Sequence, residues 1–201
     1  MKKLSSVSLI IMSAIIFSAC NGNSSQSGSA TLDSTSSKVM SSDSNKMSSS
    51  GTDSGMVMAS DEAKDFSKGA FLDGMTEVAL GKIAMKNSDM QSIKDFGEMM
   101  VNDHTKIDNG LKDLATKNMF DLPTAVTDDQ QKDIDKLSKE TGKTFDKDYV
   151  SMMVEGHKKA VATFKKEGDK ITDADYKDFI IKTLPTLQKH LDAIEAISKK
   201  M

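Results

Sequence analysis

The sequence lacks arginine and tryptophan altogether, and its 201 residues include one cysteine, two prolines and three histidines. Every one of the 27 basic residues is therefore a lysine, and 30 acidic residues outnumber them. Proteins that bind nucleic acid present clustered Lys and Arg to phosphate and often stack aromatic rings on bases. An acidic chain without arginine is not expected to bind nucleic acid. The chain also lacks a GxxxxGK phosphate loop and a GxSxG nucleophile elbow.

The lone cysteine, Cys20, ends a segment that is typical of exported proteins. Lys2 and Lys3 precede an apolar run from about Leu9 to Phe17, a pattern found in signal peptides. The run is shorter than the ~20 apolar residues that a membrane helix needs. The ending FSAC resembles the lipobox of bacterial lipoproteins, which predicts a signal peptide over 1–19 and lipid modification of Cys20 in the cell envelope. An ordinary cleaved signal with an incidental cysteine is the alternative.

Residues 21–59 predict a disordered tether. They contain fourteen serines, four glycines and three threonines, with few and scattered apolar side chains. Such a segment cannot bury enough surface to offset the entropy of ordering. A flexible chain of this length has a reach of roughly 35 Å. Residues 60–201 remain, and they are enough for one domain with a hydrophobic core.

The domain is expected to be all-α, because its apolar residues recur at three and four positions and never alternate. The pattern predicts long helices over about 61–87, 88–117 and 144–168, and another from about 173 onward. Ser60 and Ser88 are the expected N-caps of the first two. A short extra helix over about 127–141 lies in the connection between the second and third. Four long amphipathic helices make a four-helix bundle, with either a ferritin-like crossover or an up-and-down path.

The most distinctive feature is a repeat, MMVNDH at 99–104 and MMVEGH at 152–157, which holds two of the three histidines. His104, His157 and His190 all fall on the apolar stripes of their predicted helices. The first helix contributes Glu77 to its inner line, between Gly74 and Gly81. Each long helix therefore supplies one inward polar residue, and counting from the turns places all four near the middle of the bundle.

Three imidazoles and one carboxylate suit a single zinc, iron or copper ion, so Glu77, His104, His157 and His190 are candidate ligands. Met100 and Met153 precede two of the histidines by one turn. They are core filler in the simpler interpretation, and soft neighbours favouring Cu(I) in the other.

Asp73 and Asp103 are expected to be solvated, although either could approach the cluster from a neighbouring stripe.

Two other hypotheses stay open. The polar residues could form a buried hydrogen-bonded network that only fixes the helices of a structural or interaction module. The protein could also be an oxidase or peroxidase, which has the weakest support, because Val101, Val154 and Leu187 stand where the di-iron Glu-x-x-His pattern requires glutamate. The pattern favours a binding protein over an enzyme, and it identifies no protein partner.

The exported N-terminus, Glu77 with Gly81, the MVNDH and MVEGH segments and TLPTLQKH at 183–190 together resemble the family named domain of unknown function 4142. The resemblance covers about residues 60–199. It implies a ferritin-like fold and an exported protein, lipid-anchored here in the outer membrane and facing the periplasm. It implies no reaction, and it points to the same four polar positions.

Overall fold

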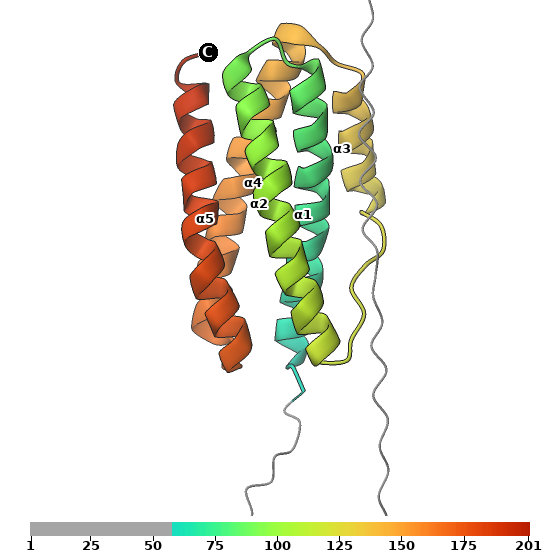
Figure 1. Ribbon diagram of the computed structural model, residues 1–201, viewed down its shortest axis with the longest axis vertical. Coiled ribbons are helices and arrows are strands. Elements are labelled where there is room, and N and C mark those ends of the chain that lie inside the picture. Colours follow the sequence, from blue (N-terminus) through green and yellow to red (C-terminus); the bar gives the residue numbers. More distant parts are fainter. Residues whose placement is uncertain (1–57) are drawn as a thin grey trace, which may run out of the picture. The chain divides into compact units, whose positions relative to one another are not determined.

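The computed structural model describes residues 58–201. The predicted signal peptide, Cys20 and all but the end of the tether lie outside this range. Five helices make up the described part of the chain (Figure 1). They are α1 (Asp61–Asn87), α2 (Gln91–Lys117), α3 (Asp128–Ser138), α4 (Gly142–Lys170) and α5 (Ala174–Ser198).

The ends of the helices are set by local capping. The Ser60 hydroxyl accepts a hydrogen bond from the Ala63 backbone N–H at 3.2 Å, as expected for an N-cap. The prediction for Ser88 is wrong, because α2 begins only at Gln91 and its N-cap, Met90, makes no side-chain bond. The Ser88 hydroxyl instead donates to the buried Asp146 carboxylate of α4, where it satisfies a charge that would otherwise lack a partner.

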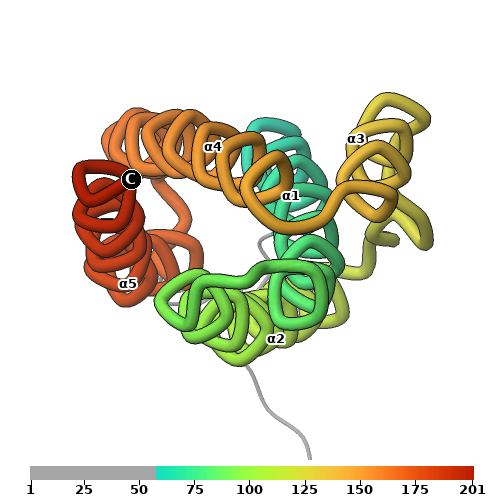
Figure 2. The backbone as a smooth tube through the Cα atoms, turned by 90° about the horizontal axis from the view of Figure 1, so that it is seen from above, coloured from blue at the N-terminus to red at the C-terminus, as the bar shows by residue number. Residues whose placement is uncertain are grey.

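The path of the chain is the ferritin-like crossover. Hairpin α1–α2 and hairpin α4–α5 each pair antiparallel helices, and the connection that carries α3 runs the length of the bundle between them (Figure 1). The view from above places α2 and α4 on opposite sides of the bundle, with α3 outside α1 (Figure 2). Helices α2 and α4 consequently run in the same direction. The predicted four-helix bundle with an extra short helix is confirmed, and the up-and-down alternative is excluded.

Apolar side chains form two clusters at different heights in the bundle. The upper cluster lies toward the end where α1 leads into α2, and the lower cluster toward the opposite end. Members of the upper cluster include Leu80, Phe96, Met100, Tyr149 and Met153. Members of the lower cluster include Phe66, Phe164, Tyr176, Ile180 and Leu187. The predicted polar residues lie at the level between them, so the core is two apolar layers with a polar layer in the middle.

The two glycines that flank Glu77 allow close contacts between α1 and α2. A Cβ atom at Gly81 would lie 2.6 Å from the carbonyl oxygen of Gly97, so the two backbones touch there. At Gly74 a Cβ atom would lie 2.1 Å from Asp108 Oδ1, so the missing side chain makes room for that carboxylate. Glycine in a helix costs ~1 kcal/mol relative to alanine. These contacts explain why alanine is absent from both positions.

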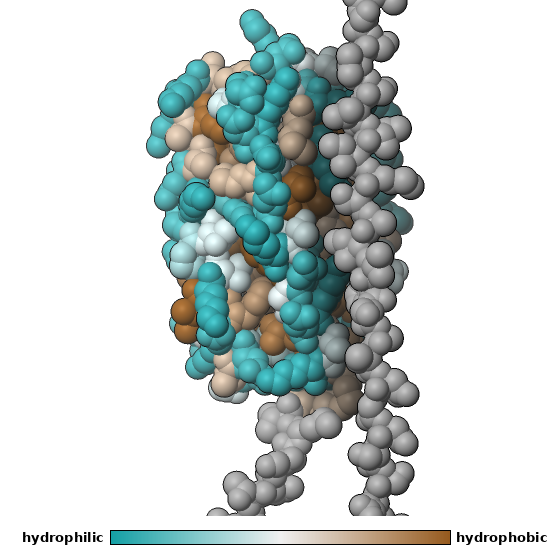
Figure 3. Space-filling model, in the orientation of Figure 1, coloured by the Kyte–Doolittle hydropathy of each residue, from teal (hydrophilic) through white to brown (hydrophobic). Residues whose placement is uncertain are grey.

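The surface over α5, α2 and α1 is mainly hydrophilic, with separate small apolar patches (Figure 3). Among residues 58–201, no helix is both long and apolar enough to cross a membrane.

Candidate metal centre

The four residues predicted from the stripes come together in the polar layer. Glu77 lies on α1, His104 on α2, His157 on α4 and His190 on α5, and all four are buried. The three imidazole centroids are 5.2 to 5.8 Å apart. One ligand nitrogen from each ring lies within 4.8 Å of the other two. The structure thus forms a group of three imidazoles, one from each of three helices.

The second nitrogen of His104 and of His157 is held by a hydrogen bond. His104 Nδ1 lies 3.0 Å from Glu77 Oε2. His157 Nδ1 lies 2.9 Å from the carbonyl oxygen of Met153, one turn earlier on α4. A carboxylate and a carbonyl oxygen can only accept, so both Nδ1 atoms carry the proton. In the neutral rings, Nε2 then carries the free lone pair.

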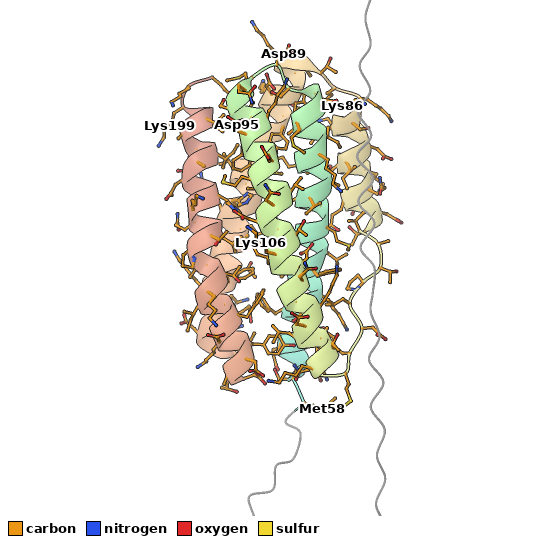
Figure 4. The ribbon with its side chains drawn as sticks, viewed as in Figure 1. Met58, Lys86, Asp89, Asp95, Lys106 and Lys199 are labelled. Atoms are coloured by element: carbon orange, nitrogen blue, oxygen red, sulfur yellow. The ribbon has the colours of Figure 1, made fainter. Side chains whose placement is uncertain are left out.

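Asp103 performs the same task for the third imidazole. Its Oδ2 lies 3.2 Å from His190 Nε2, and its Oδ1 accepts from Lys106 Nζ at 2.9 Å. Lys106 lies about halfway along α2 (Figure 4). Asp103 is therefore a bridge from α2 to α5, and it gives His190 the opposite tautomer, with the lone pair on Nδ1. The sequence left open whether Asp103 approaches the cluster, and the structure shows that it does.

Each of the three rings keeps one nitrogen without a hydrogen-bond partner in the described part of the chain. These atoms are His104 Nε2, His157 Nε2 and His190 Nδ1. They are the same nitrogens that the tautomers leave with a free lone pair. An unpaired buried polar atom costs about 1–3 kcal/mol, so three of them in one layer require an explanation beyond packing.

The charges of the layer are strongly coupled. Burial would raise the pKa of Glu77, but the charge and hydrogen bond of His104 outweigh it and lower that pKa to about 2. Burial would lower the pKa of His104, and Glu77 raises it instead. Burial and the neighbouring His104 lower the pKa of His190 to about 4. At neutral pH Glu77 is therefore ionised and His190 neutral, and the charge of Glu77 opposes the effect of burial on the pKa of His104.

A further carboxylate, Asp108, lies one turn beyond His104 and was missed by the sequence interpretation. The predicted stripe passed through Ile107, but the structure buries Asp108 against Gly74. Burial raises the pKa of Asp108 to about 6. The signal that could have identified it is an acidic residue four positions after a stripe histidine, opposite a glycine of the neighbouring helix.

Met100 and Met153 are buried in the upper cluster, next to the polar layer. Met153 contributes its carbonyl oxygen to the orientation of His157. A direct role for either sulfur remains a prediction.

Comparison with known proteins agrees with this architecture. Residues 48–197 match the family described as domain of unknown function DUF4142. The chain belongs to this family. A solved structure, "Crystal structure of DUF305 fragment from Deinococcus radiodurans", superposes with a TM-score of 0.64 at 9% identity, covering 72% of this chain and 99% of that one. At this identity the similarity shows the fold of the DUF4142 domain and nothing about its activity. No curated protein sequence matches this chain.

Proposed function

We propose that this DUF4142 domain binds one transition-metal ion, iron, copper or zinc, through His104 Nε2, His157 Nε2 and His190 Nδ1. The observation that carries the proposal is that these three nitrogens are buried without hydrogen-bond partners in the described structure, on three imidazoles that lie close enough together to share an ion. Imidazole nitrogen suits all three metals. Three protein ligands leave a coordination position for water or another small ligand.

The geometry requires a modest contraction when an ion binds. Ligand atoms on a tetrahedral ion with bonds of 2.0–2.1 Å lie about 3.3 Å apart. One nitrogen of each ring already lies within 4.8 Å of a nitrogen of each of the other two, so small side-chain rotations would bring three ligand atoms to bonding distance.

Glu77 fits an orienting role in this site better than the role of fourth ligand. It holds His104 through Nδ1, and Asp103 holds His190 through Nε2. Ligand histidines in metalloproteins usually donate their second N–H to a carboxylate or a carbonyl, which fixes the ring and increases its basicity. Glu77 also supplies a buried negative charge next to the imidazoles, which partly offsets the charge of a divalent ion.

The competing hypothesis is a structural or interaction module with a buried network. In a network that only fixes the helices, the polar atoms would satisfy one another. Here the inward nitrogens do not, which favours a bound ion. An oxidase of the di-iron type gains no support, since Val101, Val154 and Leu187 occupy the positions of its glutamates.

Elemental analysis of the purified protein tests the metal site directly. We expect about one equivalent of iron, copper or zinc, or stoichiometric uptake by calorimetry after chelation. His104→Ala with His157→Ala should abolish it, whereas Asn102→Ala, an exposed change on the same helix, should not. If the wild-type protein takes up none of the three ions, the proposal is wrong whether or not the double variant folds.

We propose, separately, that Cys20 carries a lipid and anchors the chain in the outer membrane, with the domain in the periplasm. The FSAC ending and the serine-rich tether support this location. Cys20→Ser should release the protein from the membrane fraction, whereas Ser24→Ala should leave it there. Recovery of Cys20→Ser in the membrane fraction at the wild-type level would contradict it.

A further inference from the structure

A pocket of about 430 Å³ opens between α1 and α4 and ends at the polar layer. Glu77 and His104 form its inner end. Its walls carry apolar side chains from all four long helices: Phe66, Ala70, Ile107, Ala160, Phe164 and Leu187. The pocket is therefore a cleft with an exposed rim and a floor of core residues, and its floor reaches Glu77 and His104 of the candidate metal centre.

The size and the walls of this pocket argue for an organic ligand. Small-molecule sites have volumes of about 300–1,000 Å³ and mostly apolar walls with a few polar groups. A metal ion on its way to the histidines would need neither the volume nor the apolar surface. Gly69 lies at the exposed rim of the pocket, where a Cβ atom would have no neighbour within 4 Å, so a larger side chain there could cover the entrance without a clash.

One polar atom at the inner end lacks a partner. Glu77 Oε2 pairs with His104, but Glu77 Oε1 accepts no hydrogen bond from the described residues. Its nearest ring nitrogen, His157 Nδ1, is 3.7 Å away and lies 2.9 Å from the Met153 carbonyl, to which it donates. Glu77 is 8% exposed, and Oε1 is not one of the fully enclosed unpaired atoms, so this oxygen is open to the pocket and can accept a hydrogen bond from a molecule that enters it.

The charges around the pocket favour a cation as that donor. Five carboxylates line the pocket, those of Glu62, Asp65, Asp73, Glu77 and Glu167, against the two ammonium groups of Lys159 and Lys170. A cleft with an excess of one sign of charge attracts the opposite sign. Asp73 lies one turn before Glu77 on the same face of α1. Its Oδ1 accepts from Gln130 of α3 at 3.1 Å, which leaves Oδ2 for another donor.

We propose that the pocket binds a small organic amine. Its ammonium group donates to Glu77 Oε1 and Asp73, and its apolar body lies against Phe66 and Phe164. The rings of these two phenylalanines pack edge to face, 5.0 Å apart, and offer an apolar surface close to the acidic one. The proposal concerns the pocket alone and holds with or without an ion on the histidines.

Calorimetry with three probes of nearly the same shape tests the chemistry: phenethylamine, 2-phenylethanol and 3-phenylpropionate. We expect saturable binding of the amine, binding of the alcohol weaker by about tenfold or more, and none of the acid. The titrations are run on chelated protein and on protein incubated with metal. Metal content is measured independently, so failure of the metal site and failure of the amine site are separate results.

Two variants place the binding in the pocket. Gly69→Leu should occupy the open space without a clash and weaken amine binding by about tenfold or more. Asp73→Asn should also weaken amine binding by about tenfold or more, because it removes a negative charge from the pocket. Glu98→Gln, an exposed change on α2 outside the pocket, should bind as the wild type does. The proposal is overturned if the amine gives no saturable heat at about 10 mM, if the acid binds equally well, or if Gly69→Leu binds unchanged.

Discussion

Replacing His157 by leucine should not destabilise the metal-free protein, although this side chain lies in the centre of the core. His157 has no exposed surface, and its Nε2 has no hydrogen-bond partner in the described structure. Leucine is similar in volume and is a good helix former. The substitution therefore removes an unpaired polar atom and leaves no large cavity.

The magnitude follows from two opposing terms. Relief of the unpaired nitrogen contributes about 1–3 kcal/mol, and loss of the Nδ1 bond to the Met153 carbonyl costs about 1 kcal/mol. The carbonyl itself keeps its backbone partner inside α4. The free energy of unfolding should thus stay the same or rise by up to about 2 kcal/mol. For a domain of this size that is at most a few degrees, roughly 6 °C, in Tm.

The assay is urea unfolding followed by circular dichroism, with a chelator and again with saturating metal. The wild type should gain about 2.7 kcal/mol at a metal concentration of a hundred times Kd, and His157→Leu should gain nothing. Phe164→Leu, an apolar change in the lower cluster, should lose stability equally in both conditions. A loss of about 2 kcal/mol or more by His157→Leu in the chelated protein would show that the ring is a structural member of the core and would refute the reasoning.

Three further predictions follow from particular contacts. Gly69→Ala should stabilise the protein by about 1 kcal/mol, whereas Gly81→Ala, whose Cβ would lie 2.6 Å from a backbone oxygen, should destabilise it by about 1–3 kcal/mol; paired thermal melts check the sign. Asp108→Asn should stabilise the protein by about 1–2 kcal/mol at pH 7. Burial raises the pKa of Asp108 to about 6, so the cost of ionising it in the native state develops as pH rises from ~4, where it ionises in the unfolded chain, to about 6. The gain from Asp108→Asn should therefore be complete above pH ~6 and vanish below pH ~4 in a pH series of unfolding curves. Asp103→Asn should lower metal affinity by about tenfold or more, measured by competition with a chelator, and unchanged affinity would remove Asp103 from the site.

Much of the fold could be predicted from the sequence because the helices are long and their apolar spacing is regular. The predicted first helix coincides with α1, and Thr127 with Gln130 opens α3 through a capping box. The prediction for Ser88 failed because a distant residue, Asp146, offered its hydroxyl a buried charge. Local capping rules do not include such a tertiary partner.

The candidate site, like the fold, could be predicted from the sequence only in part. Helical periodicity alone was enough to place the histidines and Glu77 inward. The partner of each ring depends on how neighbouring helices face each other, and a single sequence does not contain that information. Asp103 illustrates this point, since its role depends on the approach of α5 to α2. The pocket could not be predicted either, because four helices contribute to its walls.

The backbones of Gly81 and Gly97 touch, so α1 and α2 pack closely together as one half of the bundle. His104 belongs to that half, whereas His157 and His190 belong to the half formed by α4 and α5. A shared ion would therefore cross-link the two halves of the bundle. Hydrogen exchange at the buried amides along α1 and α4 would then slow on loading, because the halves could no longer part independently. Under this arrangement, the ion would control how freely the bundle opens.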